Sequence, residues 1–150
     1  MPDITAIGEI LIDLTQTGVN EARVPVLAAN PGGAPANVAV AAARLGAEAA
    51  FIGKVGADGF GAYLTSVLKE NRVDVSGRRT GEAATTMAIV SVDASGERDF
   101  RFVRGADADL TCGDLDLELV SRSRFLHFGS LRLTGGEARQ TTLYAVEEAR

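Results

Sequence analysis

The first half of the chain alternates short apolar runs with a helical pattern. Residues 4–12 form an apolar run that is too short for a helix and predicts a buried strand ending near Asp13. Residues 31–33, Pro-Gly-Gly, predict a break. The following alanine-rich segment, residues 36–45, is typical of a helix, and residues 49–53 predict the next strand. The order is therefore strand, helix, strand.

The middle of the chain predicts a second helix and a β-hairpin. Asp58 is placed to cap a helix over residues 59–71, where apolar positions recur at helical spacing. Residues 85–92 are rich in β-branched side chains, and residues 98–103 alternate polar and apolar positions. Residues 93–96, Asp-Ala-Ser-Gly, have the composition of the connecting turn.

Weaker patterns complete the expected fold. Turn residues before an extended stretch at residues 23–27 indicate a hairpin-like excursion early in the chain. Residues 115–120 predict a short helical crossover, residues 125–129 a further buried strand, and residues 136–150 a last helix. We expect an α/β fold with a mainly parallel sheet, flanking helices and a small accessory β-sheet.

Composition narrows the partners that we expect. The chain has 150 residues, of which 46% are hydrophobic and 23% charged, which suits one globular domain. The net charge of −5 opposes attraction to nucleic acid or to anionic lipid. No apolar run is long enough for a membrane span, so we expect a cytoplasmic protein without membrane partners. The single cysteine, Cys112, excludes an internal disulfide and is expected to be buried or half-buried.

Candidate chemistry gathers where ligands collect in open α/β sheets, beyond the carboxyl ends of strands. Asp13, the Gly32-Gly33 turn and residues 129–130 could face one crevice there. An ionised Asp13 accepts hydrogen bonds, the Asn37 amide both donates and accepts, and the glycines expose backbone N–H groups, so the set could clamp a polyol. Two alternatives stay open at this point: a tight loop that only starts a helix, and a phosphate cradle, although neither common phosphate-binding glycine pattern is present.

Several segments, in this order and spacing, resemble the ribokinase-like (PfkB-type) carbohydrate kinases. They are Gly-Glu-Ile-Leu-Ile-Asp at 8–13, Gly-Gly-Ala-Pro-Ala-Asn-Val-Ala at 32–39, Arg-Leu-Gly at 44–46 and Gly-Lys-Val-Gly-Ala-Asp at 53–58. The segments at 102–110 and 127–131 look most like the bacterial fructokinase branch of that family.

The resemblance implies a Rossmann-like αβα core with a small β-sheet lid that closes over the sugar and often forms a dimer contact. Residues 1–150 would be the amino-terminal part of the kinase domain, with lid segments at about 13–29 and 85–104. The implied sugar-binding residues are Asp13, Gly32, Gly33 and Asn37, with Phe102 and Arg104 covering or contacting the substrate from the lid.

The same resemblance implies ATP-dependent phosphorylation of a sugar hydroxyl, with fructose the expected sugar and a homodimer formed through the lid. Mg-ATP would be the phosphoryl donor. Relatives carry the catalytic base and anion hole in a later Gly-Ala-Gly-Asp segment, which these 150 residues lack. We therefore expect no catalytic and no metal-binding residue here, and we expect ATP and any monovalent cation to bind mainly outside this chain. Alternatives are a 2-keto-3-deoxygluconate or nucleoside kinase, or a non-catalytic sugar-binding or dimerising module.

Overall fold

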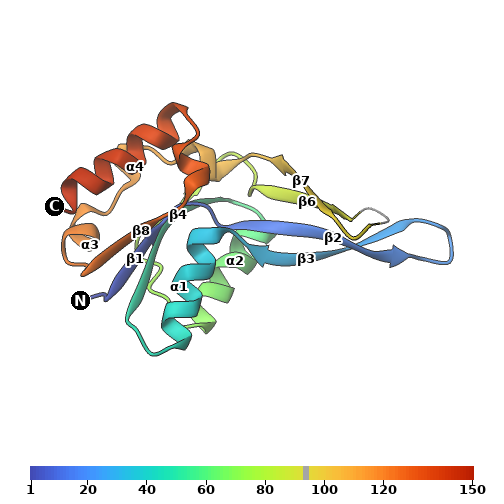
Figure 1. The fold of residues 1–150 in the computed structure, drawn as a ribbon, viewed down its shortest axis with the longest axis horizontal. Coiled ribbons are helices and arrows are strands. Elements are labelled where there is room, and N and C mark those ends of the chain that lie inside the picture. Colours follow the sequence, from blue (N-terminus) through green and yellow to red (C-terminus); the bar gives the residue numbers. More distant parts are fainter. Residues whose placement is uncertain (93–94) are drawn as a thin grey trace.

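The computed structural model describes residues 1–92 and 95–150 and contains two four-stranded sheets (Figure 1). Part of the predicted turn at 93–96 lies outside the described residues. We call the sheet with strand order β5-β4-β1-β8 the central sheet, and the sheet with order β3-β2-β6-β7 the outer sheet.

The central sheet is parallel throughout, which confirms the mainly parallel sheet expected from the sequence. Its strands are β1 (Ile4–Ile7), β4 (Ala49–Gly56), β5 (Arg78–Gly81) and β8 (Phe125–Phe128). Strand β5 was not predicted, because its sequence Arg-Arg-Thr-Gly has no apolar residue that could mark it.

Four helices cover the two faces of the central sheet (Figure 1). Side chains alternate along the strands: Ala6 and Phe51 face α1 (Ala34–Arg44) and α2 (Gly59–Glu70). Ile7 and Ile52 face the other layer, formed by α3 (Leu117–Ser121) and α4 (Gly136–Glu148). The result is a three-layer αβα body with a separate apolar cluster on each side of the sheet.

The predicted helix signals are confirmed in detail. Pro35 lies in the first turn of α1, where its missing N–H costs nothing. Asp58 is the N-cap of α2, and its Oδ1 accepts a hydrogen bond of 2.8 Å from the backbone N–H of Gly61.

The outer sheet extends away from the body (Figure 1) and consists of two antiparallel hairpins, as the sequence predicted. One is β2 (Leu11–Val19) with β3 (Pro25–Gly32), and the other is β6 (Met87–Val92) with β7 (Arg98–Val103). Strands β2 and β6 pair in parallel and so join the hairpins.

The prediction of one strand over residues 4–12 was wrong. Strand β1 ends at Ile7 in the central sheet and β2 starts at Leu11 in the outer sheet. The connecting Glu9 and Ile10 are only 4% and 2% exposed, so the apolar run continues through a junction between two sheets and hides the break. Asp13 consequently lies inside β2 rather than beyond the end of a central strand.

Two predictions of burial were also wrong. Strand β8 was expected to be buried, but it is an edge of the central sheet and Phe125 is 62% exposed. Cys112 is exposed, because it lies in a short 3-10 turn, Cys112–Asp114, at the surface before α3.

Candidate functional site

A cavity of about 440 Å³ lies where the carboxyl end of the central sheet meets the outer sheet. Four segments contribute to it: the connection from β1 to β2 with the start of β2, the entrance of α1, strand β7, and the 3-10 turn after β8. The lining residues are Glu9, Leu11, Asp13, Gly33, Ala34, Phe100, Phe102, Ser130, Leu131 and Thr134. Asp13, Gly33 and Ser130, which the sequence placed at one crevice, all line this cavity.

Strand register explains why distant residues meet in this cavity. Asp13 pairs with Ala88 of β6, and Ala88 pairs with Phe102 of β7, so the three side chains share one face of the outer sheet. Leu11 is on the same face two residues before Asp13. Alanine at the middle position leaves room between the carboxylate and the aromatic ring.

The entrance of α1 needs its two glycines because the chain is crowded there. Gly33 has a φ of 105°, and a Cβ atom on it would stand 2.5 Å from the carbonyl oxygen of Glu9. A Cβ on Gly32 would collide with the carboxylate of Asp13. The glycines therefore allow the entrance of α1, the β1–β2 connection and Asp13 to come together.

The two carboxyl groups of the cavity, Asp13 and Glu9, both have a raised pKa. Burial raises the pKa of the half-buried Asp13 above its ordinary value. Burial also raises the pKa of Glu9, and the charge of Asp107 adds to this effect, while hydrogen bonds from the backbone N–H groups of Glu9 and Ala34 oppose it. Both groups are acceptors held in surroundings poorer in water than the surface.

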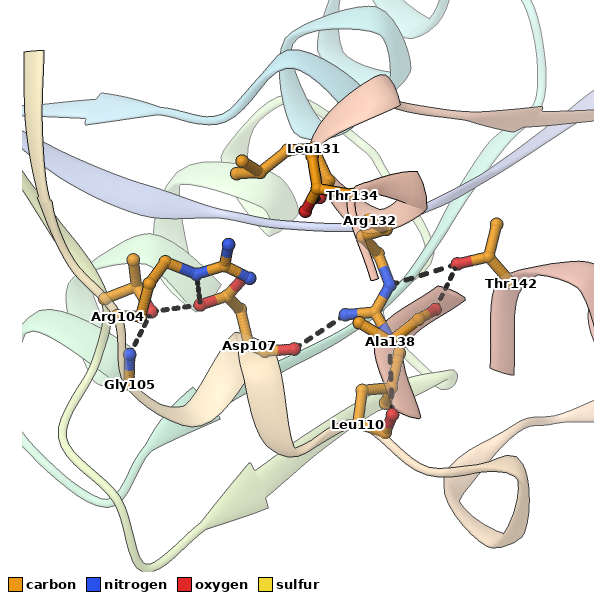
Figure 2. A network of polar contacts seen from close by, with 10 residues as sticks. Arg104, Gly105, Asp107, Leu110, Leu131, Arg132, Thr134, Ala138 and Thr142 are labelled. Atoms are coloured by element: carbon orange, nitrogen blue, oxygen red, sulfur yellow. Dashed lines mark hydrogen bonds and ion pairs between the residues drawn. The ribbon is translucent and has the colours of Figure 1, made fainter. Parts of the chain in front are cut away.

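Arg104 does not line the cavity: it directly follows β7 and is held by a network of polar contacts (Figure 2). Its Nη2 donates to Oδ2 of the fully buried Asp107 at 2.7 Å, and Asp107 also accepts a hydrogen bond from Thr86. The fully buried Arg132 donates to the carbonyl oxygens of Asp107 at 2.6 Å and Leu110 at 3.3 Å. The network joins the base of the outer sheet to the turn after β8.

Gly32 and Asn37 are not lining residues of the cavity either, although Gly32 lies against the Asp13 carboxylate. Both line a smaller hollow of about 220 Å³ between α1 and α2. Asn37 is exposed on the first turns of α1. Of the six residues that the sequence singled out, the structure brings Asp13, Gly33 and Phe102 together in the large cavity.

Glu9, Phe100 and Thr134 also line the cavity, although they were not predicted from the sequence as site residues. Glu9 lies inside the recognised segment at 8–13, and Phe100 is two residues before Phe102, so strand alternation could have identified it. Thr134 follows a short 3-10 turn, Ser130–Leu133, that has no sequence signal.

A second hollow of about 450 Å³ lies between α2 and β5, next to Lys69 and Arg78. Its hydroxyl groups are already engaged, since Thr65 donates to the carbonyl of Gly61 and Ser66 to that of Tyr63. Its lining also includes Lys69 and Arg78, and the buried Nε of Arg78 has no hydrogen-bond partner among the described residues. These cations suit an anion, whereas the carboxylates of the cavity at Asp13 suit the hydroxyl groups of a sugar, which makes that cavity the better candidate for a sugar site.

The described residues include no cluster of three His, Cys, Asp or Glu side chains that could hold a metal ion. The fold and the cavity together describe an α/β domain in which a pocket rich in hydrogen-bond acceptors lies beside a projecting β-sheet. The pfkB family carbohydrate kinase model matches residues 1–150, and the chain belongs to that family.

Individual relatives agree with this assignment. The chain is 44% identical over 152 residues to Fructokinase-1 from Oryza sativa, covering 98% of this chain and 47% of that protein. The crystal structure of fructokinase from Xylella fastidiosa matches with a TM-score of 0.91 and 34% identity, covering 99% of this chain and 47% of that one. The same Xylella protein with bound ATP matches with a TM-score of 0.90 and 32% identity, covering 99% of this chain and 49% of that one.

The chain spans about half the length of the relatives that it matches. In the part of the chain that the structure describes, we find no helix long and apolar enough to cross a membrane.

Proposed function

We propose that the protein containing this chain is an ATP-dependent sugar kinase whose substrate is fructose, and that residues 1–150 supply the sugar site and its lid. The observation that carries the proposal is the cavity in which Asp13, Gly33 and Phe102 meet, in a chain 44% identical to a fructokinase. Asp13 would accept hydrogen bonds from sugar hydroxyls, the entrance of α1 would donate from its backbone, and Phe102 would cover the sugar.

The contribution of this chain to catalysis is to position the sugar. In phosphoryl transfer the sugar oxygen attacks the γ-phosphorus, ADP leaves, and the hydroxyl proton passes to a base, so the enzyme acts through orientation and charge stabilisation. We assign the base and the Mg-ATP site to the part of the relatives' length that this chain does not span. The Xylella fructokinase with bound ATP supports ATP as the donor. A requirement for a monovalent cation stays a prediction, as does a cytoplasmic location.

The charges of the cavity favour a neutral sugar. Its described lining includes the carboxylates of Glu9 and Asp13 and no lysine or arginine, so an anionic substrate such as 2-keto-3-deoxygluconate would meet like charge. An assay of ADP release with fructose, glucose, 2-keto-3-deoxygluconate and a nucleoside tests this choice. Faster turnover of the sugar acid than of fructose would contradict it.

The proposal predicts that Asp13→Ala nearly abolishes phosphorylation of fructose while the protein stays folded. The reason is that Asp13 is the carboxylate of the outer sheet that faces the cavity. Steady-state kinetics on the complete natural protein provide the measurement, with Asp99→Ala on the exposed strand β7 as the control. Unchanged kinetics for Asp13→Ala would exclude the assigned role, and sugar binding without ATP turnover in the parent would favour a non-catalytic module.

We also propose a homodimer formed through the outer sheet. Its apolar side chains stay exposed on strands β2, β3 and β7: Val19, Val26, Leu27, Phe100, Phe102 and Val103. Exposed apolar surface of this kind is typical of protein interfaces. Analytical ultracentrifugation of Val26→Asp together with Leu27→Asp should show a monomer where the parent forms a dimer, and a monomeric parent would rule the dimer out.

A further inference from the structure

Glu9 is a charged side chain in a place where charged side chains are rare. It lies in the short connection between β1 and β2, is only 4% exposed, and lines the cavity next to the entrance of α1. A buried carboxyl group normally has hydrogen-bond partners for its oxygens, because losing water without replacement costs free energy.

The Oε2 atom of Glu9 lacks such a partner. It is buried and accepts no hydrogen bond from any residue in the ranges 1–92 and 95–150. The two guanidinium groups of the nearby network are engaged elsewhere: Arg104 donates to Asp107, and Arg132 donates to backbone carbonyls and to Thr142. An unpaired acceptor atom therefore belongs to a residue that lines the cavity.

The helix entrance holds Glu9 in position. The N-cap residue Gly33 has no side chain to cap α1, and the first turn of α1 contains no acidic residue. The backbone N–H of Ala34 acts to lower the pKa of the Glu9 carboxyl group, so this carboxylate, which comes from another segment, interacts favourably with the entrance of α1. An internal carboxylate at this end of α1 also leaves less room for a phosphate there, which favours hydroxyl groups as the ligand.

We propose that Glu9 is a second sugar-contacting residue, whose Oε2 accepts a hydrogen bond from a substrate hydroxyl while the carboxylate stays beside the entrance of α1. This inference rests on the proposed function as a sugar kinase. Glu9 and Asp13 then face the sugar from two segments, and the pocket selects ligands with at least two suitably spaced hydroxyl donors. Glu9 thereby determines specificity together with Asp13.

The experiment uses the complete natural protein and its Glu9→Gln variant. The N–H groups at the entrance of α1 favour an acceptor, so the glutamine should turn its carbonyl oxygen to α1 and its NH₂ group into the cavity. Calorimetry without ATP should show that the variant binds fructose about tenfold more weakly, the loss expected for one charge-assisted hydrogen bond. The matched control is Glu21→Gln, an exposed glutamate in the turn between β2 and β3, which should bind like the parent.

A set of singly deoxygenated fructose analogues separates a direct contact from a structural role. One analogue should bind the parent about tenfold more weakly than fructose does, and should bind parent and Glu9→Gln equally well. If each analogue loses the same factor in the variant as fructose does, the direct contact is overturned. If the variant binds fructose like the parent, Glu9 has no role in binding.

A second variant and a test of the parent protein cover the cases in which Glu9→Gln does not fold or the proposed function is wrong. If Glu9→Gln does not fold, Glu9→Asp keeps the charge but shortens the reach, and the same pattern across the analogues is expected; a uniform loss would again overturn the contact. If the parent itself neither binds nor phosphorylates fructose, the proposed function fails. A parent that phosphorylates fructose with an unaffected Glu9 variant would refute only the inference on Glu9.

Discussion

Strands β4 and β7 belong to the same chain but have opposite surroundings. Strand β4 lies inside the central sheet with helices on both faces, and all but one of its eight residues are buried. Strand β7 is the edge of the outer sheet, and all six of its residues are exposed, including Phe100 and Phe102. The comparison indicates that the central sheet supplies the stability of the domain, whereas the outer sheet keeps apolar surface available for a ligand or a partner.

The largest expected effect is on Phe51 of β4. Phe51 is fully buried, so Phe51→Ala should lower the free energy of unfolding by about 4 kcal/mol. The matched change on the outer sheet, Phe102→Ala, should lower it by less than about 1 kcal/mol while weakening the binding of fructose. Urea unfolding measures the stability and calorimetry measures the binding of fructose. Equal losses of stability in the two variants would contradict the view that the central sheet, rather than the outer sheet, stabilises the domain.

Arg132 tests the connection between the two sheets. Arg132→Met should lower the free energy of unfolding by about 3 kcal/mol, because the buried carbonyl oxygen of Asp107 loses the guanidinium donor and that of Leu110 keeps only the Thr141 hydroxyl. Thermal unfolding measures the change. The control is Arg139→Met on the exposed side of α4, which should leave the melting temperature within error of the parent. If the two variants have the same melting temperature, the buried network does not stabilise the fold.

Asp58 should have a smaller effect, although it also bridges two segments. It caps α2 and accepts hydrogen bonds from Thr85 N–H and Oγ1 at 2.8 and 2.7 Å, just before β6. Asp58→Ala should cost about 1 kcal/mol of stability in denaturant unfolding, and Asp58→Asn less, because asparagine still caps. A larger loss for asparagine than for alanine would contradict the capping role.

The pH dependence of this effect follows from the pKa of Asp58. Burial alone would raise that pKa, but the hydrogen bonds from Thr85 and Gly61 together lower it below the ordinary 3.8. The stabilisation is therefore present above pH 3.8 and is lost as the pH falls through the lower folded-state pKa.

Asp13 should show the smallest effect on stability, with the opposite sign. Burial raises the pKa of Asp13 in the folded state. Protonation at low pH therefore favours the folded parent protein, which loses stability as the pH rises through this folded-state pKa. Asp13→Asn should consequently be slightly more stable than the parent at pH 7, by less than about 1 kcal/mol because the group is half-exposed, while it binds fructose more weakly. Melting temperatures measured from pH 4 to 8 test this, and a variant less stable at pH 7 would contradict it.

Local signals in the sequence were sufficient for much of the fold. The α1 entrance, the Asp58 cap and both hairpins could be predicted because each depends on neighbouring residues: a proline in a first turn, a carboxylate three residues before an N–H group, and turn residues between alternating strands. The sheet edges could not, since β5 has no apolar pattern and the exposure of Phe125 depends on which strands pair.

In the candidate site, too, local sequence signals identified some features and only the folded structure revealed others. The sequence by itself determined that Asp13 and the glycine turn belong to a recognisable carbohydrate kinase segment. Only the tertiary structure decided that the run at 4–12 divides between two sheets, that Glu9 is buried with a free carboxylate oxygen, and that Arg104 pairs with Asp107. Burial and pairing are set by residues far apart in the chain, and Asp13, Phe102 and Thr134 become neighbours only when strand register and the turn after β8 bring them to one cavity.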